Sequence, residues 1–445
     1  MATINVTELI DASRVGRFQR VTILLCGLLL IMDGFDVQMM GYVAPAIIED
    51  WGASASEIGL VISIGLLGVM LGALIFTMVA DRIGRRPVLV WATFFFSIMM
   101  IATAHATSVA ELLTLRFITG IGLGCVVPNA TALAGEYSPR RLRVTVMMIV
   151  SVGFTAGAAF GGFVAAWLIP NFGWRSVFYF GGAVPFVIAI LMARWMPESL
   201  QFMVLRRRNR AQVDRWLTRI APSAPVEGAE LVVNEESRSG VPVLHLFRDG
   251  RALGTLLLWA VNFTNILDLY ALSAWIPTIV ERAGYATSTA VLIGATLQSA
   301  GTIGTFGLAW LIARRGFVPV LGVSFAIASL SLAVTGPSLS SLGGLVLVVV
   351  VSGWCIIGSQ PGLNALSATF YPTYMRSTGI GWGLGIGRLG GFVGPWVGGQ
   401  LLDQWSPNAL FLLAAVPALL STVIIFGLGK VLPSRHVGKA DAEVT

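Results

Sequence analysis

Two aspartates, three residues apart, lie inside a long apolar stretch near the start of the chain. They occur in the run Met32-Asp33-Gly34-Phe35-Asp36, and this spacing places both on one face of a helix. A carboxylate at bilayer depth costs a few kcal/mol, so it normally faces a cavity or a partner. Two close like charges favour keeping a proton on one of them. We expect Asp33 and Asp36 to couple proton movement to substrate movement; the alternative is a structural pair.

Two arginines and a third aspartate also lie inside apolar stretches. A guanidinium cannot lose its charge, so it needs a carboxylate from the protein or from a bound substrate. For Arg116 two interpretations stay open, namely binding of an organic anion and an ion pair with Asp33 or Asp36. For Arg388 a structural ion pair is the preferred interpretation. Together with Asp268, these residues are the candidates for substrate and proton binding.

A charged cluster follows the second long apolar stretch, and we expect it to act as a gate. Its carboxylate can pair with arginines of neighbouring helix ends, and its glycine permits a tight turn. The cluster consists of Asp81, Arg82, Gly84, Arg85 and Arg86, joined from a later run by Glu136 and Arg143. Positive charge that only sets the membrane topology is the alternative, but it does not explain Asp81.

Amide and aromatic side chains are the candidates for lining a substrate cavity. Amides can hydrogen-bond a carboxylate, and rings can stack on an aromatic substrate. A single aromatic residue is more often part of the core or exposed to lipid. The candidates are Asn129, Asn265, Tyr270, Trp354, Gln360 and Trp382.

No residue pattern indicates catalysis, a metal site or a cofactor. The three histidines and three cysteines lack ligand spacing, and the sequence has no GxxxxGK[ST] phosphate loop. The run Gly385-Ile-Gly387-Arg-Leu-Gly390 matches a dinucleotide fingerprint by letters only, because no strand precedes it. We therefore expect a protein that is not an enzyme and that uses a proton gradient, rather than a cofactor, as its energy source.

The composition is that of a protein surrounded by lipid. Hydrophobic residues make up 56% of the 445 residues and charged residues 11%, whereas a soluble domain carries about 25% charged residues. Helices satisfy their own backbone groups in lipid. An outer-membrane barrel would need short alternating segments, which these long apolar runs are not.

The apolar runs predict an all-α membrane protein with twelve transmembrane helices in two pseudo-symmetric six-helix bundles. The expected spans are 22–47, 57–79, 87–106, 110–134, 144–169, 175–195, 252–280, 289–312, 317–336, 341–367, 377–402 and 407–430. The expected regions are an N-terminal segment 1–20, a bundle 21–195, a linker 196–250 with an amphipathic helix near 208–219, a bundle 251–430 and a tail 431–445.

Lysine and arginine concentrate in every second loop. Cytoplasmic loops are enriched in these residues, so both termini and the linker are expected to be cytoplasmic. The net charge is +7 (29 − 22), and topology explains it better than nucleic-acid binding does. We expect a monomer in a lipid bilayer, without a nucleic-acid partner.

The two halves of the sequence align with each other. Asp36 falls on Asp268 (268 − 36 = 232), and Asp33 falls on Asn265 at the same offset. A parallel repeat of two six-helix units is typical of one large class of secondary transporters, which bind substrate between the repeats. We therefore expect polar groups of both halves, including Asp268, to lie at comparable depth across one cavity.

Several runs of residues resemble a known family. They are Asp33-Gly34-Phe35-Asp36, Gly41-Tyr42-Val43-Ala44-Pro45, Asp81-Arg82-Ile83-Gly84-Arg85-Arg86, Glu136-Tyr137-Ser138-Pro139, Trp275-Ile276-Pro277-Thr278, Tyr371-Pro372-Thr373 and Gly387-Arg388-Leu389-Gly390-Gly391. The chain resembles the major facilitator superfamily over essentially its whole length and, within it, the aromatic acid:proton symporters. The resemblance implies functional importance for Asp33, Asp36, Asp81, Arg116 and Glu136.

The same resemblance implies uptake of a benzoate or hydroxybenzoate with protons, by alternating access, across a bacterial inner membrane. One alternative is a carrier of another organic anion, a polyol or a drug. A second is a membrane sensor that binds such acids without moving them, although the sequence offers no segment large enough for a signalling domain. Competition by non-aromatic acids, but not by benzoates, would favour the first alternative.

Overall fold

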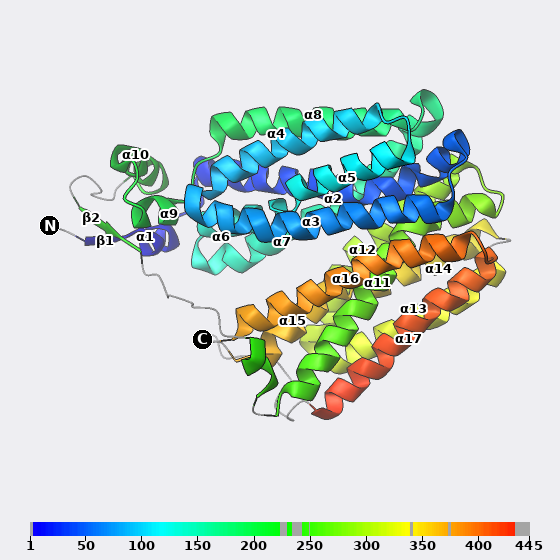
Figure 1. Ribbon diagram of the computed structural model, residues 1–445. Coiled ribbons are helices and arrows are strands. Elements are labelled where there is room, and N and C mark those ends of the chain that lie inside the picture. Colours follow the sequence, from blue (N-terminus) through cyan, green and yellow to red (C-terminus); the bar gives the residue numbers. More distant parts are fainter. Residues whose placement is uncertain are drawn as a thin grey trace.

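Helices form nearly all of the chain (Figure 1). The computed structural model describes residues 3–222, 229–233, 243–248, 250–338, 341–372 and 375–431. The expected tail 431–445 lies outside the described residues except for Val431, and so does much of the second half of the linker.

The first half of the chain forms one helical bundle. Its helices are α2 (Arg17–Trp51), α3 (Ala55–Ile83), α4 (Arg85–Ala104), α5 (Val109–Leu123), α6 (Val126–Glu136), α7 (Arg140–Phe172) and α8 (Arg175–Trp195). The second half repeats the order with α11 (Ala252–Arg282), α12 (Thr287–Arg315), α13 (Phe317–Ser338), α14 (Leu342–Ile356), α15 (Gln360–Phe370), α16 (Arg376–Leu402) and α17 (Pro407–Val431).

Eleven segments of the described chain are long and apolar enough to cross a membrane. The glycine-rich α16 is a twelfth long helix, at the expected span 377–402. The prediction of an all-α membrane protein is thus confirmed, with α16 weaker in apolar character than the other spans.

Two spans that we expected to be continuous are broken. The span 110–134 consists of α5 and α6, and the span 341–367 consists of α14 and α15. Proline cannot donate a hydrogen bond to the carbonyl four residues earlier, and Pro128 and Pro361 lie four residues after the breaks at Gly124 and Ile357. The breaks occupy equivalent places in the two halves, so the repeat extends to this irregularity.

The two bundles touch at one end and diverge toward the end that carries α9, α10 and α15 (Figure 1). At the touching end, a Cβ on Gly41 of α2 would lie 2.6 Å from the Ser273 carbonyl oxygen of α11. The Ser63 hydroxyl of α3 donates to the Phe392 carbonyl of α16 at 2.6 Å. The hydrogen bonds between the halves that the described residues make all belong to this end.

A layer of short elements covers the other end of the first bundle. It contains α1 (Val6–Ala12), α9 (Leu200–Leu205), α10 (Arg210–Ile220) and two strands, β1 (Thr3–Asn5) and β2 (Glu230–Val232), which pair in parallel. The short 3₁₀ helix η1 (Val243–Phe247) packs on the second bundle. The helix expected near 208–219 is therefore present as α10. No pattern in the sequence predicted that the N-terminal segment pairs with the linker.

Candidate functional site

Asp36 and Arg116 form a buried ion pair in the first bundle. Nη1 of Arg116 lies 3.0 Å from Oδ1 of Asp36, and the side chains are only 4% and 6% exposed. The second guanidinium nitrogen donates to the hydroxyls of Thr103 and Thr119, both at 3.3 Å, and the guanidinium carbon lies 5.3 Å from the centre of the Phe178 ring. Of the two interpretations of Arg116, the structure contains the ion pair.

Asp33 lies on the same helix in a different environment. It is 2% exposed, and its Oδ1 has no hydrogen-bond partner among the described residues. Gly34 allows this placement, because a Cβ there would lie 1.8 Å from the Phe154 carbonyl oxygen of α7. Asp33 also makes no salt bridge with a described residue, unlike Asp36 one turn further along the helix.

Arg388 approaches Asp33 from the other half of the molecule. It is exposed in the middle of α16 and is close enough to act electrostatically on both Asp33 and Tyr270. The structural ion pair expected for Arg388 is absent, because this arginine makes no salt bridge with a described residue. Its guanidinium is therefore available to a bound anion.

Amide side chains of α11 and α15 form a hydrogen-bonded cluster in the second bundle. Asn265 donates to Gln360 at 2.7 Å, and Gln360 in turn donates to Asn262 at 3.3 Å and to Asn364 at 3.2 Å. Oδ1 of Asn265 is buried without a partner in the described structure. Two of these four amides were predicted; Asn262 and Asn364 were missed because single amides in apolar spans have no distinctive spacing.

The other predicted cavity residues divide into two groups. Trp382 is 46% exposed and stacks on Trp259, with ring centres 5.8 Å apart, while Tyr270 lies near Arg388. Trp354 instead packs against Gly304 and Gly307 of α12 and lines an outer crevice with α13, so it was wrongly placed in the cavity.

Two further predictions concern Asn129 and Asp268. Asn129 is buried and donates to the carbonyl of Cys125 in its own helix at 2.8 Å. Asp268 lines a crevice between α11, α16 and α17, so the expectation that it faces Asp36 across one cavity is wrong. The direction in which α11 turns this side chain depends on how the helix packs, which the sequence repeat does not specify.

The expected gate residues pair within the first bundle. Arg85 forms an ion pair with Glu136, Arg86 donates to the carbonyl of Ala193 at 2.6 Å, and Arg143 lies 3.3 Å from Asp11. Asp81 and Arg82 are exposed, and Asp81 makes no salt bridge in the described part of the chain, contrary to our expectation. Because the bundles diverge at this end, the second half offers Asp81 no partner.

Glu198 is a residue of this cluster that we did not predict. Its Oε1 accepts hydrogen bonds from the backbone N–H groups of Arg85 at 2.9 Å and Arg86 at 3.2 Å, which caps the N-terminus of α4. Gly84 has φ 111°, and a Cβ there would lie 2.1 Å from Oε2 of Glu198. The run Pro197-Glu198-Ser199 was the available signal for this role.

Polar contacts at the touching end were also missed. Gln38 donates to the carbonyl of Ser273 at 2.6 Å, and Gln298 donates to Gln38 at 3.0 Å. Asp403 accepts from the N–H groups of Ala55 at 3.1 Å and Ser56 at 2.9 Å. Partial burial acts to raise the pKa of Asp403, but these hydrogen bonds and nearby Arg282 bring it below its usual value.

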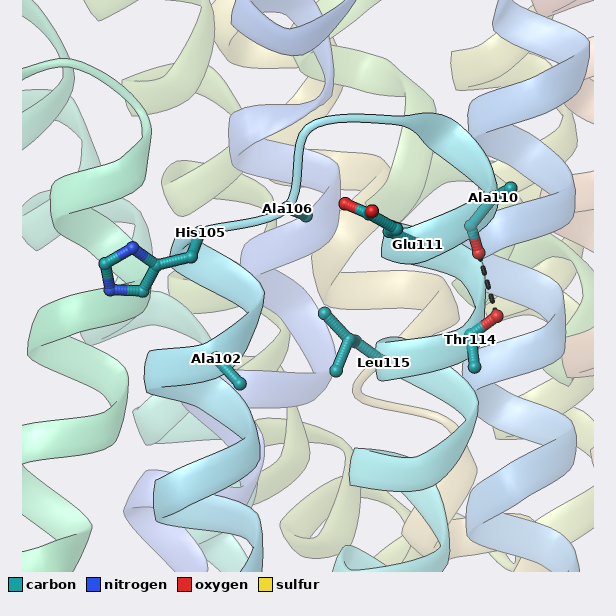
Figure 2. A pocket seen from close by; sticks show the side chains of 7 residues that line it. All are labelled: Ala102, His105, Ala106, Ala110, Glu111, Thr114 and Leu115. Atoms are coloured by element: carbon teal, nitrogen blue, oxygen red, sulfur yellow. Dashed lines mark hydrogen bonds between the residues drawn. The ribbon is translucent and has the colours of Figure 1, made fainter.

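A surface hollow of about 520 Å³ lies where α4 joins α5 (Figure 2). Its two ionisable side chains already have partners: His105 lies 3.1 Å from the Tyr179 hydroxyl, and Glu111 accepts from the N–H of Thr107 at 2.9 Å. None of the predicted site residues lines this hollow. The candidate site is therefore the region of Asp33, Arg388 and Tyr270, with the amide cluster on its second-bundle side.

Comparisons with known proteins agree with this architecture. The chain matches the family model described as Major Facilitator Superfamily over residues 26–394 and 320–444. It is 37% identical to a 4-hydroxybenzoate transporter of Pseudomonas putida, with 95% of each chain covered. It is 35% identical to a gallate transporter of Pseudomonas putida, with 96% of each chain covered.

A solved structure is similar in fold. It is a bacterial homologue of the human lysosomal transporter Spinster, with a TM-score of 0.74 and 18% identity, covering 94% of this chain and 98% of that chain. At this identity the likeness shows the arrangement of the helices alone.

Proposed function

The chain belongs to the major facilitator superfamily and, within it, to the aromatic acid transporters, and we propose that it imports a benzoate or hydroxybenzoate together with protons. Its relatives carry 4-hydroxybenzoate and gallate by name, which supports a small aromatic carboxylate as cargo. The observation that carries the proposal is Arg388, an exposed guanidinium without a salt bridge among the described residues, whose charge acts on Asp33 of the other bundle.

The carboxylate of the substrate would bind Arg388. A guanidinium forms two parallel hydrogen bonds with a carboxylate. Tyr270 packs against Gly391, three residues after Arg388, and would contribute a ring beside the substrate. The amides of Asn265 and Gln360 are suited to a ring hydroxyl, since one buried Asn265 oxygen still lacks a partner among the described residues.

Asp33 would carry the proton. When ionised, it competes with the substrate for the positive charge of Arg388; when protonated, it leaves Arg388 free to bind the substrate. Proton and carboxylate therefore bind together, as symport requires. Asp36 is the less suitable carrier, because Arg116 stabilises its charged form.

Alternating access follows from the two bundles. The bundles touch at the end opposite the linker, and positive loop charge favours a cytoplasmic linker. We infer an inward-facing state of a monomeric inner-membrane protein with both termini in the cytoplasm. In the opposite state Asp81, now unpaired in the described structure, would meet the second bundle and act in the gate.

The test is uptake of labelled 4-hydroxybenzoate by proteoliposomes, with and without an inward proton gradient. Asp33→Asn mimics the protonated carboxyl, so it should lose gradient-driven accumulation but keep exchange of internal for external substrate. Arg388→Gln should reduce both accumulation and exchange about tenfold or more. The matched control is Glu111→Gln, at an exposed position in the first turn of α5, which should behave as the parent protein does.

Two results would contradict the proposal. Gradient-driven accumulation by Asp33→Asn at the parent level would remove Asp33 from coupling. Failure of the folded parent protein to move any benzoate, while it moves a non-aromatic acid, would change the class of substrate and leave the transporter fold intact.

A further inference from the structure

A crevice of about 290 Å³ lies between α11, α16 and α17, away from the candidate transport site. Its lining is apolar except for Asp268, the one ionisable residue among the described residues that line it. Val397 and Val416 at its rim are 38% and 46% exposed, so the crevice opens on the outer surface of the bundle. In a membrane this surface faces lipid.

Asp268 has no partner for its charge in the described part of the chain. The residue is 2% exposed, and its Oδ1 is buried without a hydrogen bond to a described residue. None of the charged groups of α11 and of the long helices packed against it forms a salt bridge with Asp268 in the described structure; they are Arg17, Arg20, Asp33, Asp36, Glu49, Asp50, Glu281, Arg282, Arg314, Arg315, Arg376, Arg388 and Lys430.

Comparison with the first half of the repeat shows that Asp268 lacks the cation that its counterpart has. Asp268 is the counterpart of Asp36, whose charge is stabilised by Arg116. The equivalent helix breaks at Gly124 and Ile357 set an offset of 233 residues in this region (357 − 124), so the counterpart of Arg116 is Val349. An unpaired carboxylate in an apolar setting is costly, so the carboxyl is neutral while the crevice is empty.

We propose that the crevice binds a lipophilic amine from the bilayer, whose nitrogen pairs with Asp268 while its apolar body lies between α16 and α17. The amine arrives as the neutral base. The O–H bond of the carboxylic acid breaks, an N–H bond forms, and the product is an ammonium–carboxylate pair without any other reactant. Asp268 lies in the middle of α11, so the ligand is a free amine rather than the head group of a phospholipid, which stays at the membrane surface.

The inference does not depend on the transported substrate, and its test is binding. Purified full-length protein in detergent is titrated with decylamine, with decanol and decanoate as controls of the same chain length. Decylamine should raise the midpoint of thermal unfolding, whereas the alcohol and the acid should not. Asp268→Asn should weaken decylamine binding by about tenfold or more, because the amide cannot donate a proton to the nitrogen.

Infrared difference spectra report the proton transfer directly. Binding of decylamine to the parent protein should remove a carboxylic-acid carbonyl band, and Asp268→Asn should lack this change. At pH values below the pKa of the amine, near 10, each increase of one pH unit should raise the affinity for total amine about tenfold, since only the free base enters. A flat pH dependence would mean that Asp268 is already ionised, and it would overturn the proposal.

A second pair of variants keeps the test independent of the folding of Asp268→Asn. Val397→Trp fills the rim from an exposed position and retains the aspartate, so it should abolish decylamine binding. Leu330→Trp, at a 67% exposed position on α13 outside the crevice, is the matched control and should bind normally. Equal binding by both variants, or by Asp268→Asn and the parent protein, would show non-specific partitioning and refute the site.

Discussion

Asp36 and Asp268 occupy equivalent positions in the two bundles, yet their surroundings differ completely. Asp36 has a guanidinium at 3.0 Å inside the first bundle, whereas Asp268 lines an apolar crevice of the second and has no partner among the described residues. The two halves therefore share an aspartate at this position of the helix, but the groups around its carboxyl differ. One copy is paired with a guanidinium and the other is not, and the Arg116 and Asp268 variants below test this contrast.

The largest effect is expected for Arg116→Met. Removing one partner of a buried ion pair leaves an uncompensated charge and costs about 3–5 kcal/mol of unfolding free energy. Thermal and denaturant unfolding in detergent measure it. The double variant Arg116→Met with Asp36→Asn removes both charges and should recover most of the loss. If the single variant is as stable as the double, the pair contributes little and the contrast with Asp268 fails.

Glu198→Ala should have an intermediate effect. It removes the acceptor that caps α4, and loss of a helix cap costs about 1 kcal/mol. The carboxylate also carries a charge near the paired Arg85, so Glu198→Gln should recover part of the loss. Unfolding midpoints of the two variants decide this; equal stability of Glu198→Ala and the parent protein would argue against the capping role.

Asp268→Asn should cost less than about 1 kcal/mol, because no described partner is left unsatisfied when a neutral acid is replaced by an amide. The measurement is the same unfolding assay, with Asp36→Asn as the matched control at the equivalent position. Asp36→Asn removes the partner of Arg116 and should be clearly more destabilising. Equal losses at the two positions would mean that Asp268 has a charged partner after all.

The smallest effect concerns pH at the contact between α3 and α16. The pKa of Asp403 is lower in the folded protein than its usual value, so its contribution is complete above the ordinary aspartate pKa, about 4. It is lost as the pH falls through the lower, folded pKa. We expect this half-exposed group to contribute about 0.5 kcal/mol or less to the unfolding free energy. The measurement is the difference in unfolding free energy between the parent protein and Asp403→Asn, which should disappear in acid. A difference that grows in acid would contradict the sign.

The sequence by itself determined the membrane class, the spans and the twofold repeat. The reason is that an unpaired backbone group or a charge in lipid costs free energy. Membrane spans must therefore be long, apolar and almost free of charged residues, and such segments can be recognised in the sequence. The same penalty drew attention to Asp33, Asp36, Asp268, Arg116 and Arg388, and all five lie inside the helices of the structure.

Tertiary structure alone decided which of these ionisable groups is paired, which is available and which lines an apolar crevice. Spacing relates residues within one helix, whereas the partner of a side chain depends on how helices cross. The approach of α2 to α7 at Gly34, the reach of Arg116 to Asp36 and the turning of Asp268 toward α17 each join segments far apart in the chain. Contacts between distant segments depend on packing, and no local pattern in the sequence records them.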